Sequence, residues 1–226
     1  MAKAKPRPAP AAAKKPATLR RAPSQQRARE RVERILAVAS ELIAAAGSDT
    51  LRMSEVAEQA GISIGSLYQY FPDKAAILRT LAERYNAEGR ACIEAGLAPV
   101  TDLKSLCQAF AALVDIYYGY FLAEPVMRDI WSGTQADKAL REIELDHSRV
   151  IGGLLAATLS RIWPKLDRKD LAAEAFLLMH LGEATMRLAV SVKRREGDAL
   201  VAAYQAMAAR EFAAIAARAP RRARRS

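Results

Sequence analysis

The stretch from Gly61 to Lys74, with the sequence GISIGSLYQYFPDK, limits what this chain can fold into more than any other segment does. Gly61 can adopt the positive φ that ends a helix, and Ser63 is a suitable N-cap for the next one. Pro72 stops that second helix, and Asp73 with Lys74 opens a third. The short helix in between carries the hydroxyl and amide groups of Ser66, Tyr68, Gln69 and Tyr70. A short helix this polar is expected to be displayed for contact with another molecule.

Helical periodicity continues through the rest of the chain. From Ser24 onward, apolar residues recur at the spacing of an amphipathic helix. We find neither a β-type alternation nor an internal repeat, so the predicted fold class is all-α with about nine helices. Besides the short helix described above, they are expected at 24–46, Met53–Ala60, Lys74–Leu97, Leu103–Leu122, Pro125–Trp131, Lys138–Ile162, Asp170–Lys193 and Ala199–Ala217.

Positive charge is concentrated at the two ends of the chain. Residues 1–34 contain eleven basic and two acidic residues, a net charge of +9, and the tail from Arg218 adds +5 to a total of +10. The region between them is therefore mildly acidic, at −4. Residues 1–23 hold too little large apolar surface to fold, so this basic tail is expected to be disordered. Two interpretations remain open: basic arms that attract phosphate groups, or tails that increase solubility.

Composition also indicates a compartment. No run of about 18 apolar residues is present, so neither a transmembrane helix nor a membrane partner is predicted. The basic N-terminus lacks the apolar block of a secretory signal. A disulfide between Cys92 and Cys107 would be unneeded, and packed thiols in a reducing cytoplasm are the favoured interpretation. We expect a cytoplasmic protein.

The segment from about Arg27 to Lys74 resembles the N-terminal DNA-binding domain of the TetR family of transcriptional regulators. The residues that carry the resemblance run from Met53 to Ser63 (MSEVAEQAGIS) and from Gly65 to Lys74 (GSLYQYFPDK). They include both helices of a helix-turn-helix motif and the LYxYFPxK sequence that ends it. Beyond this segment, the length and the helical pattern are similar to the family, but the sequence itself is not diagnostic.

The resemblance implies a three-helix DNA-binding domain over residues 24–74 and a larger helical domain over residues 75–217, followed by a basic C-terminal tail over 218–226. The larger domain would bind a small effector and form a homodimer. The implied function is that of a sequence-specific transcriptional regulator, a repressor released from its operator by the effector. The implied partners are double-stranded operator DNA, an unknown small molecule and a second copy of the chain.

In a helix-turn-helix motif, the second helix enters the major groove and its first residues reach the base edges. Ile64, Gly65 and Gln69 are therefore predicted to face the bases. The Gln69 amide can pair with an adenine edge, and the Ile64 side chain can contact a thymine methyl group. Gly65 would let the backbone approach closely. Leu67 and Phe71 are assigned to the core of the small domain.

Phosphate contacts are predicted for the other polar residues around this helix. Hydrogen bonds to phosphates, which fix the register without reading the sequence, are expected from Ser63, Ser66, Tyr68 and Tyr70. Lys74 stands at the start of the next helix, where its ammonium group and the free N–H groups suit a phosphate. The tyrosine rings can also cover the domain core, because tyrosine has an apolar body and a polar tip.

The start of the preceding helix departs from the family pattern. Arg52 stands where the family usually carries a hydroxyl residue, so the helix cap either passes to Thr50 or is lost. Arg52 itself either reaches a phosphate or remains in solvent. Ser54, in the same turn, is a further candidate for DNA contact. Arginines within residues 20–34 are candidates for an adjacent minor groove.

In the second domain, aromatic and polar residues concentrate as in a mostly apolar ligand pocket. The candidate lining residues are Phe110, Tyr117, Trp131, His147, Phe176, Met179, His180 and Glu183. Core packing is the alternative for each of them, because a helical bundle needs large apolar residues at this spacing.

The last two long helices carry small residues that permit close helix approach. These residues are Ala172, Ala173, Ala175, Gly182, Ala184, Ala202, Ala203, Ala206 and Ala209. Apolar side chains on both sides of the segment 171–192 leave surface to bury. A four-helix interface between two subunits is predicted, with an intramolecular bundle as the alternative.

No enzymatic constellation is found in the sequence. It lacks a Ser/His/Asp or Cys/His arrangement, a phosphate-binding glycine loop and the two Glu-x-x-His motifs of a di-iron site. His147 and His180 have no zinc-like spacing to the cysteines, so no metal site and no cofactor are predicted. The alternative to a specific regulator is a non-specific nucleic-acid-binding or nucleoid-associated helical protein. The basic tails favour that alternative, whereas the acidic middle and the displayed polar helix favour specific binding.

Overall fold

The computed structural model describes residues 22–133 and 138–220, and all regular secondary structure in these two ranges is helical. The all-α prediction is confirmed for this part of the chain. Its elements are α1 (Ala22–Ala46), the 3₁₀ turn η1 (Ser48–Thr50), α2 (Met53–Gln59), α3 (Ile64–Tyr70), α4 (Lys74–Leu97), α5 (Leu103–Ala123), α6 (Pro125–Gly133), α7 (Lys138–Ile162), α8 (Arg168–Ser191) and α9 (Arg194–Arg218).

Most helix boundaries lie within two residues of their predicted positions, and the largest difference is at α9. This helix begins at Arg194 rather than at Ala199. Its first turn holds Gly197, a weak helix former that made the sequence look like a loop. The turn is helical because it is packed: Gly197 is buried, and a Cβ there would lie only 2.3 Å from the Ala189 carbonyl oxygen. The Arg194 guanidinium also donates to Asp198 at 2.7 Å.

The N-terminal prediction needs a small correction. The basic segment 1–23 was expected to be disordered, but its last two residues belong to α1, which begins at Ala22. The remainder of that segment and residues 221–226 lie outside the described residues.

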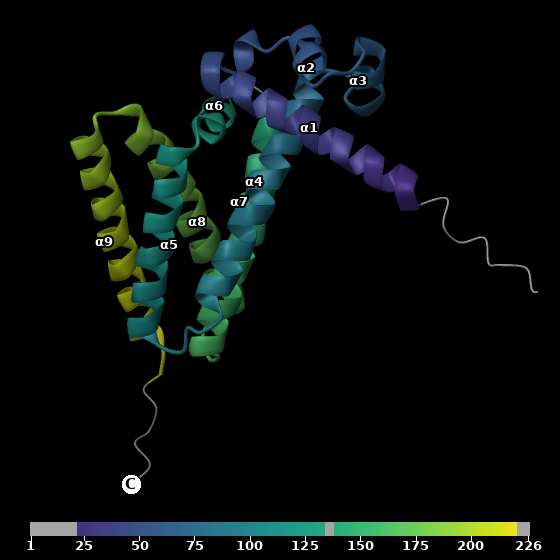
Figure 1. Cartoon of the computed structure of the whole chain (residues 1–226). Helices are drawn as coiled ribbons and strands as arrows, with labels where there is room; N and C mark the ends of the chain where they lie inside the picture. The colour runs from purple at the N-terminus through teal and green to yellow at the C-terminus, as the bar shows by residue number, and fades with distance from the viewer. Residues whose placement is uncertain (1–21, 134–137, 221–226) are drawn as a thin grey trace, which may run out of the picture.

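The helices form two parts joined by α4. Helices α1, α2 and α3 lie together at one end of the molecule, and α5, α7, α8 and α9 form the larger part with α4, which packs mainly against α5 and α7 (Figure 1). Helix α6 lies between the two parts and packs against α1 and η1 as well as against α4, α5 and α8. The predicted domain boundary after Lys74 falls at the first residue of α4, and this helix continues unbroken into the larger part.

Helix α5 is long and apolar enough to pass a length and composition test for a membrane span, the one described helix that does so. It packs against α4, α6, α8 and α9 within the bundle. Its apolar character follows from this position, because Leu106, Phe110 and Phe121 are buried in the common core. Apolar helices of this kind are expected at the centre of helical domains.

Candidate nucleic-acid interface and ligand cavity

Helix α3 is shaped by local interactions that the sequence predicted. Gly61 has a φ of +65° in the turn after α2, and Ser63 caps α3 by accepting a hydrogen bond from the Ser66 backbone N–H at 3.1 Å. Leu67 and Phe71 are buried and anchor the helix to the small domain. The anchored face leaves the opposite face of α3 free for contact.

The exposed face of α3 contains the predicted base-reading residues. The large side chains of Ile64 and Tyr68 are 44% and 50% exposed, which is unusual for residues of this size and hydrophobicity. Gly65 and Gln69 are also exposed. A Cβ at Gly65 would meet no atom within 4 Å, so packing inside the protein does not require glycine there. Close approach of another molecule to the backbone at Gly65 stays a prediction.

The remaining predicted phosphate-binding residues surround this face. Ser63 is exposed, whereas Ser66 and Tyr70 are half-buried, and the Tyr70 ring packs against the core. Lys74, at the start of α4, donates from Nζ to the Ser48 and Asp49 carbonyl oxygens at 3.1 and 3.0 Å. An ammonium group has three N–H donors, so Lys74 ties α4 to the η1 turn and keeps one donor for a phosphate.

The N-terminus of α2 settles the question of its cap. Arg52 occupies the N-cap position, and its side chain makes no capping hydrogen bond. The Thr50 hydroxyl donates instead to the Ala46 and Gly47 carbonyl oxygens, at the end of α1. The side-chain cap of α2 is therefore lost rather than passed on. Arg52 and Ser54 are both exposed at this helix end.

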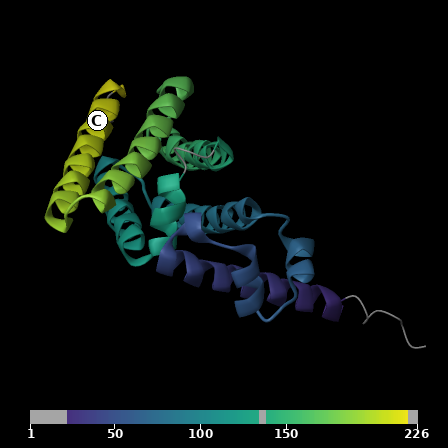
Figure 2. The ribbon, with the colours of Figure 1, turned by 90° about the horizontal axis from the view of Figure 1, so that it is seen from above.

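A row of basic residues lies on the N-terminal half of α1. Arg27, Arg29, Arg31 and Arg34 are exposed. This half of α1 projects away from the body on the same side as α3 (Figures 1 and 2). Its position adds positive charge beside the recognition face, where phosphates of a bound duplex would lie.

The larger part encloses a cavity of about 300 Å³ between α4, α5, α8 and α9. Helix α4 contributes six lining residues, including Tyr85, Glu88 and Cys92, and α9 contributes Tyr204. Met127 of α6 and Ile151 of α7 complete the wall. The lining is predominantly apolar and aromatic, as in small-molecule sites.

Four of the eight residues predicted for a pocket line this cavity: Phe110, Tyr117, Met179 and Glu183. The other four, Trp131, His147, Phe176 and His180, are not among its lining residues. Trp131 is fully buried on α6, and His147 is buried on α7. The Phe176 ring stacks on His180, with 6.1 Å between ring centroids. The sequence showed that these residues are large and helical, but only packing decides which side of a helix faces the cavity.

Sequence reasoning missed the contribution of α4 to the cavity. This helix was interpreted as a connection, although Tyr85, Cys92 and Ile93 lie on one apolar side of it at helical spacing. Cys92 and Cys107 are free thiols, as expected.

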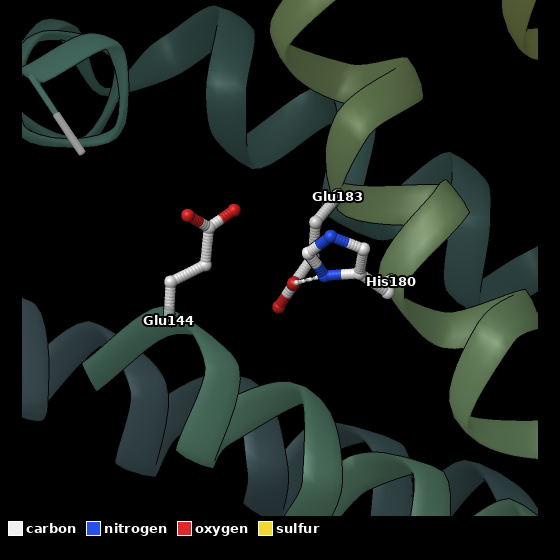
Figure 3. A group of neighbouring side chains, drawn as sticks. All are labelled: Glu144, His180 and Glu183. Atoms are coloured by element: carbon white, nitrogen blue, oxygen red, sulfur yellow. Dashed lines mark ion pairs between the residues drawn. The ribbon is translucent and has the colours of Figure 1, made fainter. Parts of the chain in front are cut away.

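A buried polar cluster joins α7 to α8 behind the cavity wall. Figure 3 shows Glu144 reaching from α7, and Glu183 and His180 reaching from α8. Glu144 is ion-paired with Arg187. The Ser148 hydroxyl lies 2.5 Å from Glu183 Oε2 and 3.1 Å from His180 Nδ1. His147 Nε2 lies 3.8 Å from Glu183 Oε1.

Burial changes the protonation of this cluster. Desolvation raises the pKa of Glu183 to about 8, with the nearby Glu144 carboxylate adding to the rise, while the Ser148 hydrogen bond and Arg187 oppose it. Desolvation and Arg90 lower the pKa of His147 to about 4. At neutral pH, therefore, Glu183 is mostly protonated and His147 is neutral.

The same cluster has the donor atoms of a metal site. Potential ligand atoms of Glu144, His180 and Glu183 lie within 4.8 Å of one another. The sequence could not show that these three residues meet, because Glu144 lies on a different helix from the other two. The Arg187 ion pair opposes a bound cation, since it already neutralises Glu144. The donor set therefore does not fit a metal ion well.

An apolar stripe remains exposed on α8 and α9. Leu177, Leu181 and Leu188 follow one face of α8 and are 57%, 39% and 51% exposed. Met207 on α9 is 53% exposed, and exposed alanines flank it. The small residues of the two helices have two different environments: Ala175 is buried and Gly182 adjoins the Tyr204 hydroxyl, whereas Ala173, Ala202, Ala203 and Ala206 face solvent. The buried small residues pack within the chain, whereas the predicted use of the exposed ones in a subunit interface stays a prediction.

Two family models match the chain. Residues 35–81 match bacterial regulatory proteins of the tetR family, and residues 104–216 match the tetracyclin repressor-like C-terminal domain. The first match contains the whole helix-turn-helix, and the second extends from α5 into α9. A comparison with curated proteins gives no match.

Solved structures share the fold across both parts. A TetR-family transcriptional regulator from Pectobacterium atrosepticum is 19% identical, with a TM-score of 0.62 over 81% of this chain and 92% of that chain. RolR in complex with resorcinol is 21% identical, with a TM-score of 0.58 over 87% and 98%. FadR from Bacillus subtilis in complex with stearoyl-CoA is 19% identical, with a TM-score of 0.57 over 77% and 94%. Identities at this level show the fold alone.

Proposed function

Because the chain belongs to the TetR family of bacterial transcriptional regulators, we propose that it is a sequence-specific repressor that a small molecule releases from its operator. Members of this family are DNA-binding repressors of transcription, and many respond to ligands. The observation that carries the proposal is α3: an anchored helix whose free face presents Ile64, Gly65 and Gln69. A cytoplasmic location follows from this role.

Base recognition is assigned to the exposed face of α3. The Gln69 amide is free to form paired hydrogen bonds with adenine, and Ile64 to contact a thymine methyl group. Tyr68, Ser63 and Lys74 lie around this face and supply phosphate contacts that fix the register. So few base contacts give limited discrimination, each good pair being worth about 1–3 kcal/mol, so two copies of α3 are needed.

The exposed stripe of α8 and α9 supports a homodimer as the means of providing two copies. Three leucines in a row on one helix face are costly to leave in water, at roughly 25 cal/mol for each Å² of apolar surface. A two-fold axis through this stripe would bury the same face of both subunits in a four-helix arrangement. The operator is then expected to contain two symmetric half-sites.

Release by an effector is supported by two direct links between the cavity and the small domain. The C-terminal half of helix α4, from Tyr85 to Leu97, lines the cavity, and the first residue of the helix, Lys74, binds the η1 carbonyl oxygens. Helix α6 places Met127 on the cavity wall and Asp129 on the Ser48 backbone N–H, at 2.9 Å. A ligand that displaces α4 or α6 would therefore shift α1–α3 relative to their counterparts in the dimer.

Titration of labelled duplexes tests DNA recognition. Selection of bound genomic fragments supplies the operator, and affinity for it is compared with that for a random duplex at several salt concentrations. We expect the operator to bind more tightly at every concentration, and Gln69→Ala to relax preference at one base pair of each half-site. Equal affinity for the two duplexes at every salt concentration would reject specific recognition. It would indicate non-specific binding instead, the alternative to which the exposed arginines of α1 are suited.

A charged residue in the stripe tests the dimer. Leu188→Glu places a carboxylate at the centre of the proposed interface, so we expect a monomer with greatly weakened operator binding. Val150→Glu is the matched control, because Val150 is also an exposed apolar residue but lies on α7. Sedimentation measurements on the full chain give the oligomeric state. A Leu188→Glu protein that remains dimeric would place the interface elsewhere.

A further inference from the structure

One carboxyl oxygen of a cavity-lining residue makes no hydrogen bond within the described residues, and His147 Nε2 lies 3.8 Å from it. Glu183 is 1% exposed and lines the cavity, and its Oε1 accepts no hydrogen bond from any part of the chain that the structure describes. The other oxygen, Oε2, is held by Ser148, which fixes the orientation of the carboxyl group. A buried polar atom without a hydrogen bond costs free energy, and a ligand group in the adjoining cavity could supply the missing partner.

The charges around the cavity select the kind of group. Among the described lining residues there is no lysine, arginine or histidine, whereas two carboxyl groups, Glu88 and Glu183, are present. An anionic ligand would face these carboxyl groups without a compensating positive charge. A positively charged ligand would find an acceptor at Glu183 and no competing cation on the wall.

Aromatic rings strengthen this selection. Five of the lining residues are aromatic: Tyr85, Phe110, Tyr117, Tyr120 and Tyr204. A cation above an aromatic face is attracted by the negative centre of the ring, and a desolvated site enhances the attraction. The same rings would also hold the apolar body of a ligand.

The groups that face Glu183 offer no unpaired permanent cation to an ionised Glu183 carboxylate. They come from four helices and are Glu144, His147 and Ser148 on α7, His180 and Arg187 on α8, Tyr117 on α5 and Tyr204 on α9. Arg187 is the only permanent cation among them, and it is paired with Glu144. Burial keeps His147 neutral, and it raises the pKa values of both tyrosines above their usual value, so the tyrosines are neutral too.

We propose that the effector is a lipophilic cation, a small apolar or aromatic amine whose charged nitrogen binds Glu183 Oε1 inside the cavity. This inference rests on the proposed function only in stating that the ligand regulates DNA binding. Binding of the ligand to the cavity can be measured without DNA. Since the empty-site pKa of Glu183 is about 8, binding of a cation near neutral pH displaces the carboxyl proton into solvent. Uptake of the ligand is thus coupled to release of about one proton.

A series of three compounds with one apolar body tests the proposal. Phenylbutylamine, phenylbutanol and phenylbutanoate differ only in carrying an ammonium, a hydroxyl or a carboxylate group. Calorimetric titration of the full-length protein near neutral pH should give the tightest binding for the ammonium compound, by about tenfold over the alcohol, and the weakest for the carboxylate. Repeating the titration in buffers of different ionisation enthalpy should show release of about one proton with the ammonium compound alone.

Two variants sharpen the result. Glu183→Gln keeps a polar group for Ser148 but removes the carboxylate charge. We expect this variant to bind the ammonium compound about tenfold more weakly and to change its affinity for the alcohol less than about threefold. It should also abolish proton release. Glu174→Gln is the matched control on α8, where the carboxylate pairs with Arg218 and is not among the cavity-lining residues. It should bind all three compounds like the unsubstituted protein.

Three results would overturn the proposal. The first is tighter binding of the alcohol or the carboxylate than of the ammonium compound by the unsubstituted protein. The second is an unchanged preference for the ammonium compound in Glu183→Gln. The third is no detectable binding of any of the three compounds. The preference within the series is measured on the unsubstituted protein, so it stands even if a variant is unstable. Operator binding is measured separately, so these results leave the assignment as a DNA-binding regulator intact.

Discussion

The recognition helix and the ligand cavity are built from very different amounts of chain. Helix α3 with its caps spans Ser63 to Phe71, and its cap, buried anchor and exposed face all arise from neighbours in the sequence. The cavity takes its walls from six helices, from Tyr85 on α4 to Tyr204 on α9. One region is local and exposed, whereas the other is non-local and enclosed.

This difference separates two kinds of substitution. On the exposed face of α3, a changed side chain loses a contact with DNA but few contacts within the protein, so affinity should change and stability should not. In the buried cluster behind the cavity, desolvation dominates, so stability and its pH dependence should change first. Measuring both quantities for each variant tests the comparison directly.

The largest effect is expected at Glu183. The pKa of Glu183 is about 8 in the folded protein and lies near 4.5 in the unfolded chain. Between these pH values the folded protein binds more protons than the unfolded chain. The free energy of unfolding therefore falls as the pH rises from about 4.5 through 8. Glu183→Gln removes this loss, so the variant should gain on the order of 2–4 kcal/mol relative to the unsubstituted protein between pH 5 and 9. Urea unfolding at several pH values measures it.

His147 supplies the internal control for that experiment. Its pKa is lowered to about 4, so its neutral buried form contributes stability above about pH 6.5 that is lost as the pH falls toward 4, the opposite direction to Glu183. This contribution is present in both proteins and cancels in the difference between them. A difference that does not depend on pH would show that Glu183 is ionised in the folded protein.

The next effect is expected on the recognition face. Tyr68→Phe removes only a hydroxyl group from a side chain that is half exposed, so operator affinity should fall by about 1 kcal/mol, roughly fivefold, with no change in the melting temperature. Random duplexes should lose affinity equally, because a phosphate contact carries no sequence information. Tyr120→Phe, which removes the hydroxyl that donates to Glu88 at 3.0 Å, is the control and should leave DNA affinity unchanged.

Asp129 lies at the junction of the two regions, so its substitution should affect stability more than DNA contact. Asp129→Ala leaves the Ser48 N–H without its acceptor and should cost about 1 kcal/mol of unfolding free energy. Asp146→Ala, which breaks an exposed pair with Arg149, should cost about half of that or less. Equal costs in chemical denaturation would mean that the α6 contact does not hold the small domain in place.

The smallest effect is expected for Arg52→Ser, which should increase stability and, if Arg52 contacts DNA, decrease DNA affinity. Arg52→Ser restores the missing cap of α2 and should add about 0.5–1 kcal/mol to stability. If Arg52 contacts a phosphate, the slope of log affinity against log salt concentration should become shallower by about one. An unchanged slope would place Arg52 in solvent in the complex.

The fold class, most helix boundaries and the exposed face of α3 were within reach of the sequence. Each depends on interactions over a few positions: the repeat of apolar residues, the Ser63 cap, the positive φ of Gly61 and the stop at Pro72. The one clear boundary error, at α9, arose where the Gly197 contact with Ala189 on another helix overrides local preference.

The cavity was only half predicted, for a physical reason. Aromatic and polar residues on α5 and α8 pointed to Phe110, Tyr117, Met179 and Glu183, but the same argument also selected Trp131 and His147, which packing turns into the core. The contribution of α4 was missed entirely. A helix has several apolar sides, and the sequence does not state which neighbour covers each one.

The sequence alone determined the short helix that precedes Lys74, with its cap, its buried anchors and its exposed face. The interactions that form this helix join residues within about one turn of it. Only the tertiary structure decided the environment of Glu183, whose unpartnered oxygen, raised pKa and apolar surroundings come from residues on other helices. Desolvation and electrostatic interactions act through space, so distance along the chain gives no measure of them.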